Sequence, residues 1–416
     1  MWRRTLESSL RSAMRTFPAV VLTGARQAGK TTLLREALGA SHRYVSLDDP
    51  DLRARAQADP VGFLTEHPPP VVIDEIQNVP AILPYIKRRI DEDRRPGGWI
   101  LTGSQAFSLM VGVTESLAGR AAILSLLPFS VAEACGAPAD DEDVDSLLHR
   151  TFRAATPEEA DLSGTPALSD WILRGGWPEP RSNPEVDRKL WCSSYIQTYL
   201  ERDLRALAHV GDLASFERFL RLCAARTGQL LNLSDLARDT GVSQSTAARW
   251  LSVLEASGQV FLLQPLHGNY AKRLVKSPKL YFTDTALATF LVGLHDPSPT
   301  MLGPMAGALV ETVVVVEWLK AFRHRGEPPS MSFFRTGDGL EVDLVIERNG
   351  KLFAAEVKAT STVLPRHAAA LRTFTHRTGA AGPAVIFADV DRATAVAPGV
   401  VVRPWCALGL STPPAG

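Results

Sequence analysis

Residues 24–31, GARQAGKT, constrain the fold of this chain more than any other stretch. They follow the apolar run AVVLT and precede a helical pattern, so they match the phosphate-binding loop GxxxxGK[ST] in its strand–loop–helix setting. Glycines let backbone N–H groups close around phosphate oxygens, and the start of the helix adds partial positive charge. We predict that Lys30 reaches the β- and γ-phosphates of ATP and that Thr31 holds Mg²⁺. The other predicted nucleotide contacts are Gly24, Ala25, Arg26, Gln27, Ala28, Gly29 and Thr32.

Two later apolar runs end in polar residues, as strands do at the ligand-binding edge of an open α/β sheet. In PPPVVIDE, we expect Asp74 to bind nucleotide and support the Mg²⁺ ion, and Glu75 to polarise the attacking water. In WILTGSQ, Ser104 or Gln105 is placed to sense the γ-phosphate. The stretch ESLAGR then sets Arg120 at the end of an expected helix. A catalytic contact and an ordinary surface salt bridge are both open for this arginine.

Bulk composition bounds the class of protein. A chain of 416 residues exceeds one ordinary core and predicts about two to four domains. The formal net charge is zero, so any nucleic-acid surface must be local. Four widely spaced cysteines without a CxxC pair argue for a reducing compartment and against disulfides and structural zinc. The longest apolar run, at 313–316, is short and charges interrupt the start, so we expect a cytoplasmic protein without a membrane segment.

The middle of the chain combines an acidic loop with helical patterns. GAPADDEDVD is typical of an exposed loop, and we interpret the helical patterns up to about residue 210 as a lid or connector on the first domain. In SDLARDTGVSQSTAARWLSVLEASG, a short helix, a turn at Gly241–Val242 and a second helix opening at Ser243 predict a helix-turn-helix. QVFLLQPL and KLYF are its expected wing strands.

This winged segment offers two surfaces for DNA. One is the second helix, from which we expect Gln244, Ser245, Thr246 and Arg249 to face a groove or phosphates. The other is the wing, where basic residues cluster at Lys272, Arg273, Lys276 and Lys279. The segment is only mildly basic, with nine Lys/Arg against six Asp/Glu over 212–285, so a protein–protein connector remains the competing interpretation.

Residues 341–358, EVDLVIERNGKLFAAEVK, predict a hairpin with a two-residue type I′ turn at Asn349–Gly350. The turn sets the register, in which the numbers of opposed residues add to 699. Expected pairs are Arg348 with Lys351, Ile346 with Phe353 and Leu344 with Ala355. One face then carries Val342, Leu344, Ile346, Phe353, Ala355 and Val357. The other face sets Asp343 opposite Glu356, with Lys358 two residues beyond.

Opposed carboxylates destabilise a sheet unless a cation pairs them. Mg²⁺ is a natural partner, because it is commonly held by one or two carboxylates, waters and substrate phosphate. Upstream, MAGALVETVVVVEWLKAF predicts a helix with Glu311 inside its apolar stretch, where an unpaired carboxylate is costly. A charged surface hairpin would not explain these features together, and we favour a metal-dependent site.

Three resemblances follow from these motifs. The order of phosphate loop, acidic strand end, polar strand end and arginine resembles AAA-type ATPases, in which such an arginine often reaches a neighbour's γ-phosphate; this implies a homo-oligomer, either a ring or a dimer. The order Glu311, Asp343, Glu356–Val–Lys358 resembles the PD-(D/E)xK nucleases. That resemblance implies that the three acids are metal ligands, for Mg²⁺ or Mn²⁺, and that Lys358 is catalytic. Val342 stands where the proline of that motif would be.

The whole chain resembles a family of AAA-type ATPases with a C-terminal domain of unknown function of the 4143 type. LTGARQAGKTT, VVIDEIQ, ILTGSQ, SLAGR, RGGWPEP, YIQTYLERDL and EVDLV…EVK carry the likeness. It implies a multidomain α/β chain with a parallel P-loop sheet (1–130), a helical lid or connector (131–210), a winged helix-turn-helix (211–295) and a restriction-endonuclease-like domain (296–416).

Two functions are consistent with this sequence. The first is an ATP-hydrolysing protein that binds and processes DNA, with a metal-dependent nuclease site at its C-terminal end. The second is a nucleotide-switched regulator that binds DNA or a protein and whose nuclease-like domain is catalytically silent. A structural protein without ATP turnover would leave Lys30, Asp74 and Glu75 idle together, so it is the weakest interpretation.

Overall fold

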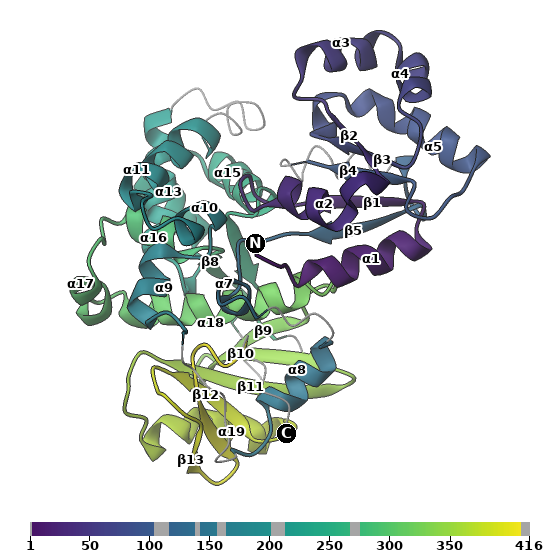
Figure 1. Cartoon of the computed structure of the whole chain (residues 1–416). Coiled ribbons are helices and arrows are strands. Elements are labelled where there is room, and N and C mark those ends of the chain that lie inside the picture. Colours follow the sequence, from purple (N-terminus) through teal and green to yellow (C-terminus); the bar gives the residue numbers. More distant parts are fainter. Residues whose placement is uncertain are drawn as a thin grey trace.

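The computed structural model describes residues 2–103, 116–137, 142–155, 164–200, 213–266 and 275–408, with the side chains of 199 and 200 excepted. Within these residues the chain forms a five-stranded, a three-stranded and a six-stranded sheet. We call the parts built on them the N-terminal, middle and C-terminal modules (Figure 1). Ser104, Gln105, Lys272 and Arg273 lie outside the described residues.

The N-terminal module is a parallel sheet with strand order β2-β3-β4-β1-β5. Its strands are β1 (Ala19–Thr23), β2 (Arg43–Ser46), β3 (Val71–Asp74), β4 (Trp99–Thr102) and β5 (Ala121–Ser125). Its helices are α1 (Leu6–Thr16), α2 (Lys30–Leu38), α3 (Pro50–Ala58), α4 (Pro60–Glu66) and α5 (Leu83–Glu92), with short 3-10 turns at Gly39–Ser41, Ile76–Asn78 and Pro80–Ile82. Two apolar clusters cover the two faces of the sheet, as expected of strands buried on both sides. The phosphate loop and Asp74 therefore meet at the carboxyl edge of the strands.

The middle module is helical around the small sheet β6-β8-β7. Its strands are β6 (Gln229–Leu230), β7 (Val260–Leu263) and β8 (Lys279–Phe282), and its helices are α13 (Leu213–Ala225), α14 (Leu233–Thr240), α15 (Gln244–Ala256) and α16 (Thr285–Leu291). Gly241, at φ +82°, ends α14 in the left-handed conformation that glycine favours. The Ser243 side chain then caps α15 by accepting from the Thr246 N–H. These two residues explain why the predicted turn forms there.

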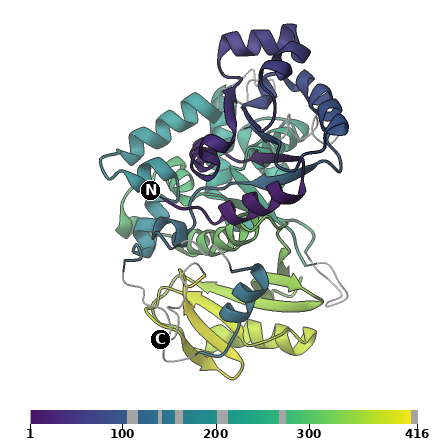
Figure 2. The same cartoon turned by 45° about the vertical axis from the view of Figure 1, so that its right-hand side comes forward.

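The C-terminal module is a six-stranded sheet with order β13-β14-β12-β11-β10-β9. Its strands are β9 (Met331–Arg335), β10 (Glu341–Arg348), β11 (Lys351–Lys358), β12 (Ala384–Ala388), β13 (Thr394–Ala397) and β14 (Val400–Pro404). One face contacts α18 (Ala306–Arg323), and the other contacts α19 (Ala369–Thr378), which follows a 3-10 turn at Pro365–Ala368. The long helix α18 runs along the boundary with the other modules (Figure 2).

The predicted hairpin register is confirmed. Leu344 pairs with Ala355, Ile346 with Phe353 and Arg348 with Lys351. Asn349 and Gly350 have φ of +52° and +72°, as a type I′ turn requires. Placing Val342 on the same face as Leu344 was wrong. The register against β9 shifts between Val342 and Val345, and this irregularity turns Val342 into the cluster beneath α19.

The described elements of the segment 131–210 are divided between two cores, so they do not form one lid on the N-terminal module. Its described elements are α7 (Val131–Ala134), α8 (Val144–Thr151), α9 (Leu168–Arg174), α10 (Pro178–Ser182), α11 (Arg188–Tyr195) and a π turn at Ile196–Leu200. The buried residues of α8 lie in the core of the C-terminal module, and α8 crosses that sheet in both cartoon views. Trp177 and Tyr195 instead join the middle core. The short helix α17 (Pro297–Leu302) leads into α18.

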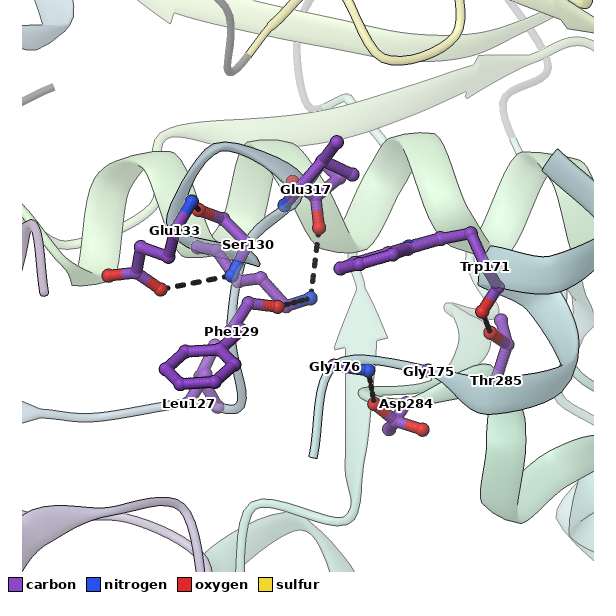
Figure 3. Close-up of polar contacts among 12 residues, drawn as sticks. Leu127, Phe129, Ser130, Glu133, Trp171, Gly175, Gly176, Asp284, Thr285 and Glu317 are labelled. Carbon is purple, nitrogen blue, oxygen red and sulfur yellow. Dashed lines mark hydrogen bonds and ion pairs between the residues drawn. The ribbon is translucent and has the colours of Figure 1, made fainter. Parts of the chain in front are cut away.

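The three modules meet at residues 126–130 and 175–176, which we call the junction (Figure 3). The Phe129 N–H donates to the Gly176 carbonyl at 2.7 Å, and the Gly176 N–H donates to Asp284 of the middle module at 2.7 Å. On the other side, Lys320 of α18 donates to the Phe129 carbonyl at 2.8 Å. A side chain at Gly176 would overlap the Phe129 carbonyl oxygen. The RGGWPEP motif therefore supplies glycine where segments far apart in sequence come closest.

Candidate functional site

The phosphate loop has the backbone shape that its glycines predict. Gly24 and Gly29 have φ of +140° and +97°, and Gln27 also lies in the left-handed region at +59°. A Cβ at Gly24 would overlap the carbonyl oxygen of Leu126, the residue after β5. Gly24 is therefore required both by its conformation and by the close approach of the neighbouring backbone.

Lys30 and Thr31 lie at the start of α2, as predicted. Lys30 is buried, and its Nζ donates to the carbonyls of Gly24 at 2.8 Å and Ala25 at 2.9 Å. The ammonium thus lies over its own loop, where phosphate oxygens would be bound. Thr31 Oγ1 is 3.4 Å from Asp74 Oδ2, which brings the two predicted magnesium contacts side by side. A hydroxyl beside a carboxylate at a helix start is a donor set that fits Mg²⁺.

Asp74 and Glu75 end β3, and residues that the sequence analysis missed hold them in place. The hydroxyls of Tyr44 and Thr102 both donate to the Asp74 carboxylate. Burial, together with the hydrogen bond to Asp74, raises the pKa of Tyr44 well above its usual value, so the phenol stays protonated. Gln77 donates to the Glu75 carboxylate. Thr102 ends the polar-tipped strand β4, which was a usable signal; Tyr44 had none.

Arg120 lies at the opposite edge of the sheet from the phosphate loop. It immediately precedes β5, and Ala121 pairs in parallel with Ala19 at the start of β1, whereas the loop follows the end of β1. Its guanidinium binds Asp91 of α5 in bidentate fashion, at 2.6 and 3.0 Å. Within its own chain Arg120 forms the salt bridge that the sequence left open. A role toward a neighbouring subunit stays a prediction.

The phosphate loop is also part of the middle module's core. Ala25 and Ala28 are fully buried in that core, in the same cluster as Trp177. The Cβ position of Gly258, in the turn between α15 and β7, lies 3.7 Å from the Ala25 backbone nitrogen. A movement of the phosphate loop would therefore change the packing of the middle module directly.

Arg4 links the phosphate loop to the junction. Its guanidinium donates to the carbonyls of Ala28 at 2.8 Å and Leu127 at 2.6 Å. The Arg4 Nε also lies 3.2 Å from Oε1 of Glu133, an ion pair without hydrogen-bond geometry. Glu133 is completely buried, and it accepts from the backbone N–H groups of Thr5 at 2.9 Å and Ser130 at 3.0 Å.

His324 of α18 completes this buried network. Its Nε2 accepts from the Leu127 N–H at 3.2 Å, so the ring proton is on Nδ1, which faces Glu133 Oε1 at 3.2 Å. A neutral imidazole satisfies both partners. Burial lowers the pKa of His324, although Glu133 opposes this shift. Burial alone would raise the pKa of Glu133, but Arg4 and His324 hold it far below its usual range.

The predicted DNA contacts fall into two groups. Gln244, Ser245 and Arg249 are exposed on α15. Thr246 is half-buried, and its hydroxyl is hydrogen-bonded to that of Ser243. Lys276 is exposed, while Lys279 is 2% exposed and belongs to an ion cluster described below. Counting Lys279 among the surface cations of the wing was therefore wrong.

The chain on both sides of 267–274 is bound to the edge strand β9 of the C-terminal sheet. The Leu266 N–H donates to the Phe333 carbonyl at 2.7 Å, and the Val275 N–H donates to the Arg335 carbonyl at 3.1 Å. This pairing covers the edge of the six-stranded sheet, where unpaired N–H and C=O groups would otherwise be exposed. The base of the predicted wing is therefore an interface with the C-terminal module.

The acidic cluster of the C-terminal module surrounds Lys279. Its Nζ lies 2.7 Å from Glu311 Oε1, 2.7 Å from Glu341 Oε1 and 3.6 Å from Asp343 Oδ1. The Tyr281 hydroxyl donates to the same Glu311 oxygen at 2.6 Å. Burial lowers the pKa of Lys279, but the three carboxylates outweigh it and raise the pKa above its usual value, so the ammonium stays charged.

Glu356 and Lys358 stand beside this cluster on β11. Lys358 Nζ donates to Glu356 Oε1 at 2.6 Å. Asp343 instead accepts from the Val357 N–H at 2.9 Å through Oδ2. Burial first, and then the Asp343 carboxylate, raise the pKa of Glu356 to about 8, while burial and Asp343 raise that of Glu311 to about 7. Among the residues that the structure describes, Glu356 Oε2 is a buried oxygen without a hydrogen-bond partner.

The donor set fits a divalent metal ion poorly. The orphaned oxygen of Glu356 is the kind of group a cation would satisfy. However, Lys279 already binds Glu311 and Asp343, and the part of the chain that the structure describes has no group of three or more potential ligands arranged to hold a metal. The predicted metal triad of Glu311, Asp343 and Glu356 is brought together without the geometry of a metal centre.

The nucleotide site and its sheet define the class of protein: this is an AAA-type P-loop ATPase. Residues 16–135 match the family model described as "AAA domain". Residues 165–298 match a domain of unknown function, DUF8612, and residues 306–407 match a second one, DUF4143. No helix in the described ranges combines the length and apolar character needed to cross a membrane.

Curated relatives identify the family. The chain is 33% identical over 364 residues to "Uncharacterized protein Rv2008c" of Mycobacterium tuberculosis. This match covers 86% of this chain and 74% of the relative. The same values hold for "Uncharacterized protein Mb2031c" of Mycobacterium bovis. The chain therefore belongs to the family of these proteins. This chain combines an AAA domain with a DUF4143 domain.

Solved structures give more distant similarities. A Walker-type ATPase of Pyrococcus abyssi is 17% identical, with a TM-score of 0.44, and the match covers 70% of this chain and 96% of that one. The RuvB Holliday junction branch migration motor of Thermotoga maritima is 16% identical, with a TM-score of 0.27, over 62% of this chain and 88% of that one. At these TM-scores the likeness carries no functional information.

Proposed function

We propose that the protein is an ATP-hydrolysing switch in which the state of the phosphate loop sets the position of the middle and C-terminal modules, and that the middle module binds DNA. The observation that carries the switch is the burial of Ala25 and Ala28, two residues of the phosphate loop, inside the middle core. A loop that only held nucleotide would have no need of that contact.

The proposed chemistry uses residues already in position. Lys30 would exchange the Gly24 and Ala25 carbonyls for β- and γ-phosphate oxygens. Thr31 and Asp74 would hold Mg²⁺, which when bound offsets phosphate charge. Glu75, oriented by Gln77, would accept a proton from the attacking water.

The same exchange provides the switch. Release of the Ala25 carbonyl by Lys30 would free the loop to reshape around phosphate, and Ala25 is the residue that faces Gly258. Arg4 would pass a displacement of Ala28 to Leu127 and the junction. Both contacts connect the phosphate loop to residues outside it, one in the middle module and the other at the junction.

Hydrogen exchange of the full chain tests the switch. We expect ATP to change exchange at residues 254–260 in Glu75→Gln, which should bind ATP without turning it over. Lys30→Ala, a loss-of-binding control, should show no change. Exchange that changes in the phosphate loop alone would refute the switch while leaving the ATPase assignment intact.

The DNA-binding proposal rests on the exposed side chains of α15 and on Lys276. Arg249→Ala and Lys276→Ala should each weaken binding of a labelled duplex, and each should reduce the steepness of its salt dependence by about one unit. Lys351→Ala, at the exposed start of β11, is the matched loss of charge. Equal effects from all three would exclude α15 and Lys276 as the DNA-binding surface.

Oligomerisation is proposed from Arg120 alone. If Arg120 serves a neighbouring site, mixing Arg120→Ala with Lys30→Ala should restore part of the ATPase activity that each variant lacks. Mixtures no more active than their components would leave Arg120 as the partner of Asp91 only.

Metal-dependent cleavage of DNA is the second candidate function. The orphaned Glu356 oxygen beside Lys358 favours it. Nicking of supercoiled plasmid by the parent with Mg²⁺ or Mn²⁺, lost in Lys358→Ala, would support it. Plasmid that stays intact with either ion would exclude cleavage and leave only the proposal that the protein binds DNA.

A further inference from the structure

The cation of the acidic cluster comes from another module. Lys279 begins β8, in the sheet of the middle module, whereas Glu311 lies on α18 and both Glu341 and Asp343 lie on β10. The Nζ of Lys279 donates to Glu311 Oε1 at 2.7 Å and forms ion pairs with Glu341 at 2.7 Å and Asp343 at 3.6 Å, so three carboxylates surround one ammonium. The Phe333 ring, 5.5 Å from Nζ, closes another side.

The backbone fixes this lysine in place. Lys279 pairs with Leu263 of β7 on one side and Leu230 of β6 on the other. Nearby, Phe333 of β9 donates to the Gln264 carbonyl at 3.1 Å, and its own carbonyl accepts from Leu266. A strand paired on both sides fixes the backbone of Lys279, and its side chain is only 2% exposed, so Nζ is held among the carboxylates while the two modules stay in contact.

A divalent ion on Glu311 and Asp343 would have to displace this ammonium. Glu311 Oε1 already accepts from Lys279 and Tyr281, and Asp343 Oδ2 accepts from the Val357 N–H. A metal ion bound beside the Lys279 ammonium would be repelled by it. A metal ion that took the carboxylates from Lys279 would leave the lysine as an uncompensated buried charge.

We propose that Lys279 is the resident cation of this cluster, standing where a nuclease-like site would hold a metal ion, and that it fastens the middle module to the C-terminal module. Glu311 is then an ion-pair partner and not a metal ligand. This assignment does not depend on the ATP switch.

Binding of Mn²⁺ to the full chain without nucleotide, followed by loss of the free-ion paramagnetic resonance signal, tests the proposal. The nucleotide site is common to all variants, so differences report on the cluster. We expect Glu311→Gln to bind as many Mn²⁺ ions as the parent. Lys279→Met should gain one Mn²⁺ ion per chain, and Lys279→Met/Glu311→Gln should lose it again. Lys351→Met, which removes an exposed lysine, should gain none.

Two results would overturn the proposal: a parent Mn²⁺ site that Glu311→Gln removes, or a folded Lys279→Met that gains no site. If Lys279→Met does not fold, the comparison between the parent and Glu311→Gln decides the question. Equal numbers of bound Mn²⁺ ions support Lys279 as the resident cation, and loss of one ion in Glu311→Gln refutes it. The fastening role predicts faster hydrogen exchange in β9 and β10 of Glu341→Gln than in the parent. Unchanged exchange there would refute that role.

Discussion

The buried ion pair between Arg4 and Glu133 should contribute more to the free energy of unfolding than an exposed ion pair such as that between Arg11 and Glu7. Both side chains are buried, with 4% of Arg4 and none of Glu133 exposed. Replacing Arg4 by Met leaves Glu133 charged in the interior with only His324 and two backbone N–H groups. Breaking a buried pair in this way costs about 3–5 kcal/mol. Arg4→Met also removes donors to Ala28 and Leu127, so the upper half of that range is expected.

A double-mutant cycle separates the pair from its surroundings. Glu133→Gln should cost a similar amount, and Arg4→Met/Glu133→Gln should cost about 2 kcal/mol less than the two single changes added together. The control is Arg11 with Glu7, an i,i+4 pair at 2.8 Å on the surface of α1, the helix that follows Arg4. That pair should show a coupling of only about 0.3–0.5 kcal/mol.

Urea unfolding followed by circular dichroism gives the four free energies of each cycle. The measured slope with urea must stay constant for the comparison to hold, because a changed slope reports a change in exposed surface. A cost of Arg4→Met no larger than that of Arg11→Met, or additive costs at Arg4 and Glu133, would refute the reasoning. It would mean that the junction tolerates an unpaired Glu133.

Three further predictions follow from the same contacts. Glu75→Gln should retain ATP binding and lower turnover by roughly 10²–10⁴-fold, measured by phosphate release; turnover above a tenth of the parent's would exclude Glu75 as the base. Gly176→Ala should destabilise by about 1–3 kcal/mol in urea, because its Cβ overlaps the Phe129 carbonyl oxygen; an unchanged midpoint would contradict that overlap. Since the pKa of His324 is lowered in the folded state, the unfolded chain takes up that proton first on acidification. Stability should therefore fall as pH drops below about 6.5, by at most about 1.4 kcal/mol per unit from this residue, and His324→Gln should remove that part of the loss between pH 7 and 5.

The sequence predictions that the structure confirms depend only on residues close together in the chain. The register of β10 and β11 follows from two turn residues, because Asn349 and Gly350 accept positive φ and the side-chain period of a strand is two. The phosphate loop likewise depends on spacing within eight residues. Neither inference needs any knowledge of what packs against the segment.

Predictions that differed from the structure required contacts between distant segments. Val342 changes face because β9, a neighbouring strand, shifts register there. The helix α8 joins the C-terminal core because its apolar residues Val144, Leu147 and Leu148 pack there. Its Asp145 also binds Arg348 at 2.7 Å, about two hundred residues away in the sequence. Tyr44 reaches Asp74 from an adjacent strand, and a lone tyrosine in a strand carries no sign of that use.

The acidic hairpin shows how far such reasoning extends. The sequence predicts that Asp343 and Glu356 oppose each other, with Glu311 on a nearby helix, and three such carboxylates require a cation whatever its identity. The sequence favoured a metal ion because the PD-(D/E)xK pattern that it resembles implies metal ligands at these acids. In the fold, β8 delivers Lys279 into the same place, since the wing's base pairs with β9 and leaves the lysine pointing at β10. Lys279 and Lys358 together still leave one oxygen of this cluster unsatisfied, because Glu356 Oε2 has no hydrogen-bond partner in the described structure. Burial first, and then the Asp343 carboxylate, raise the pKa of Glu356 to about 8.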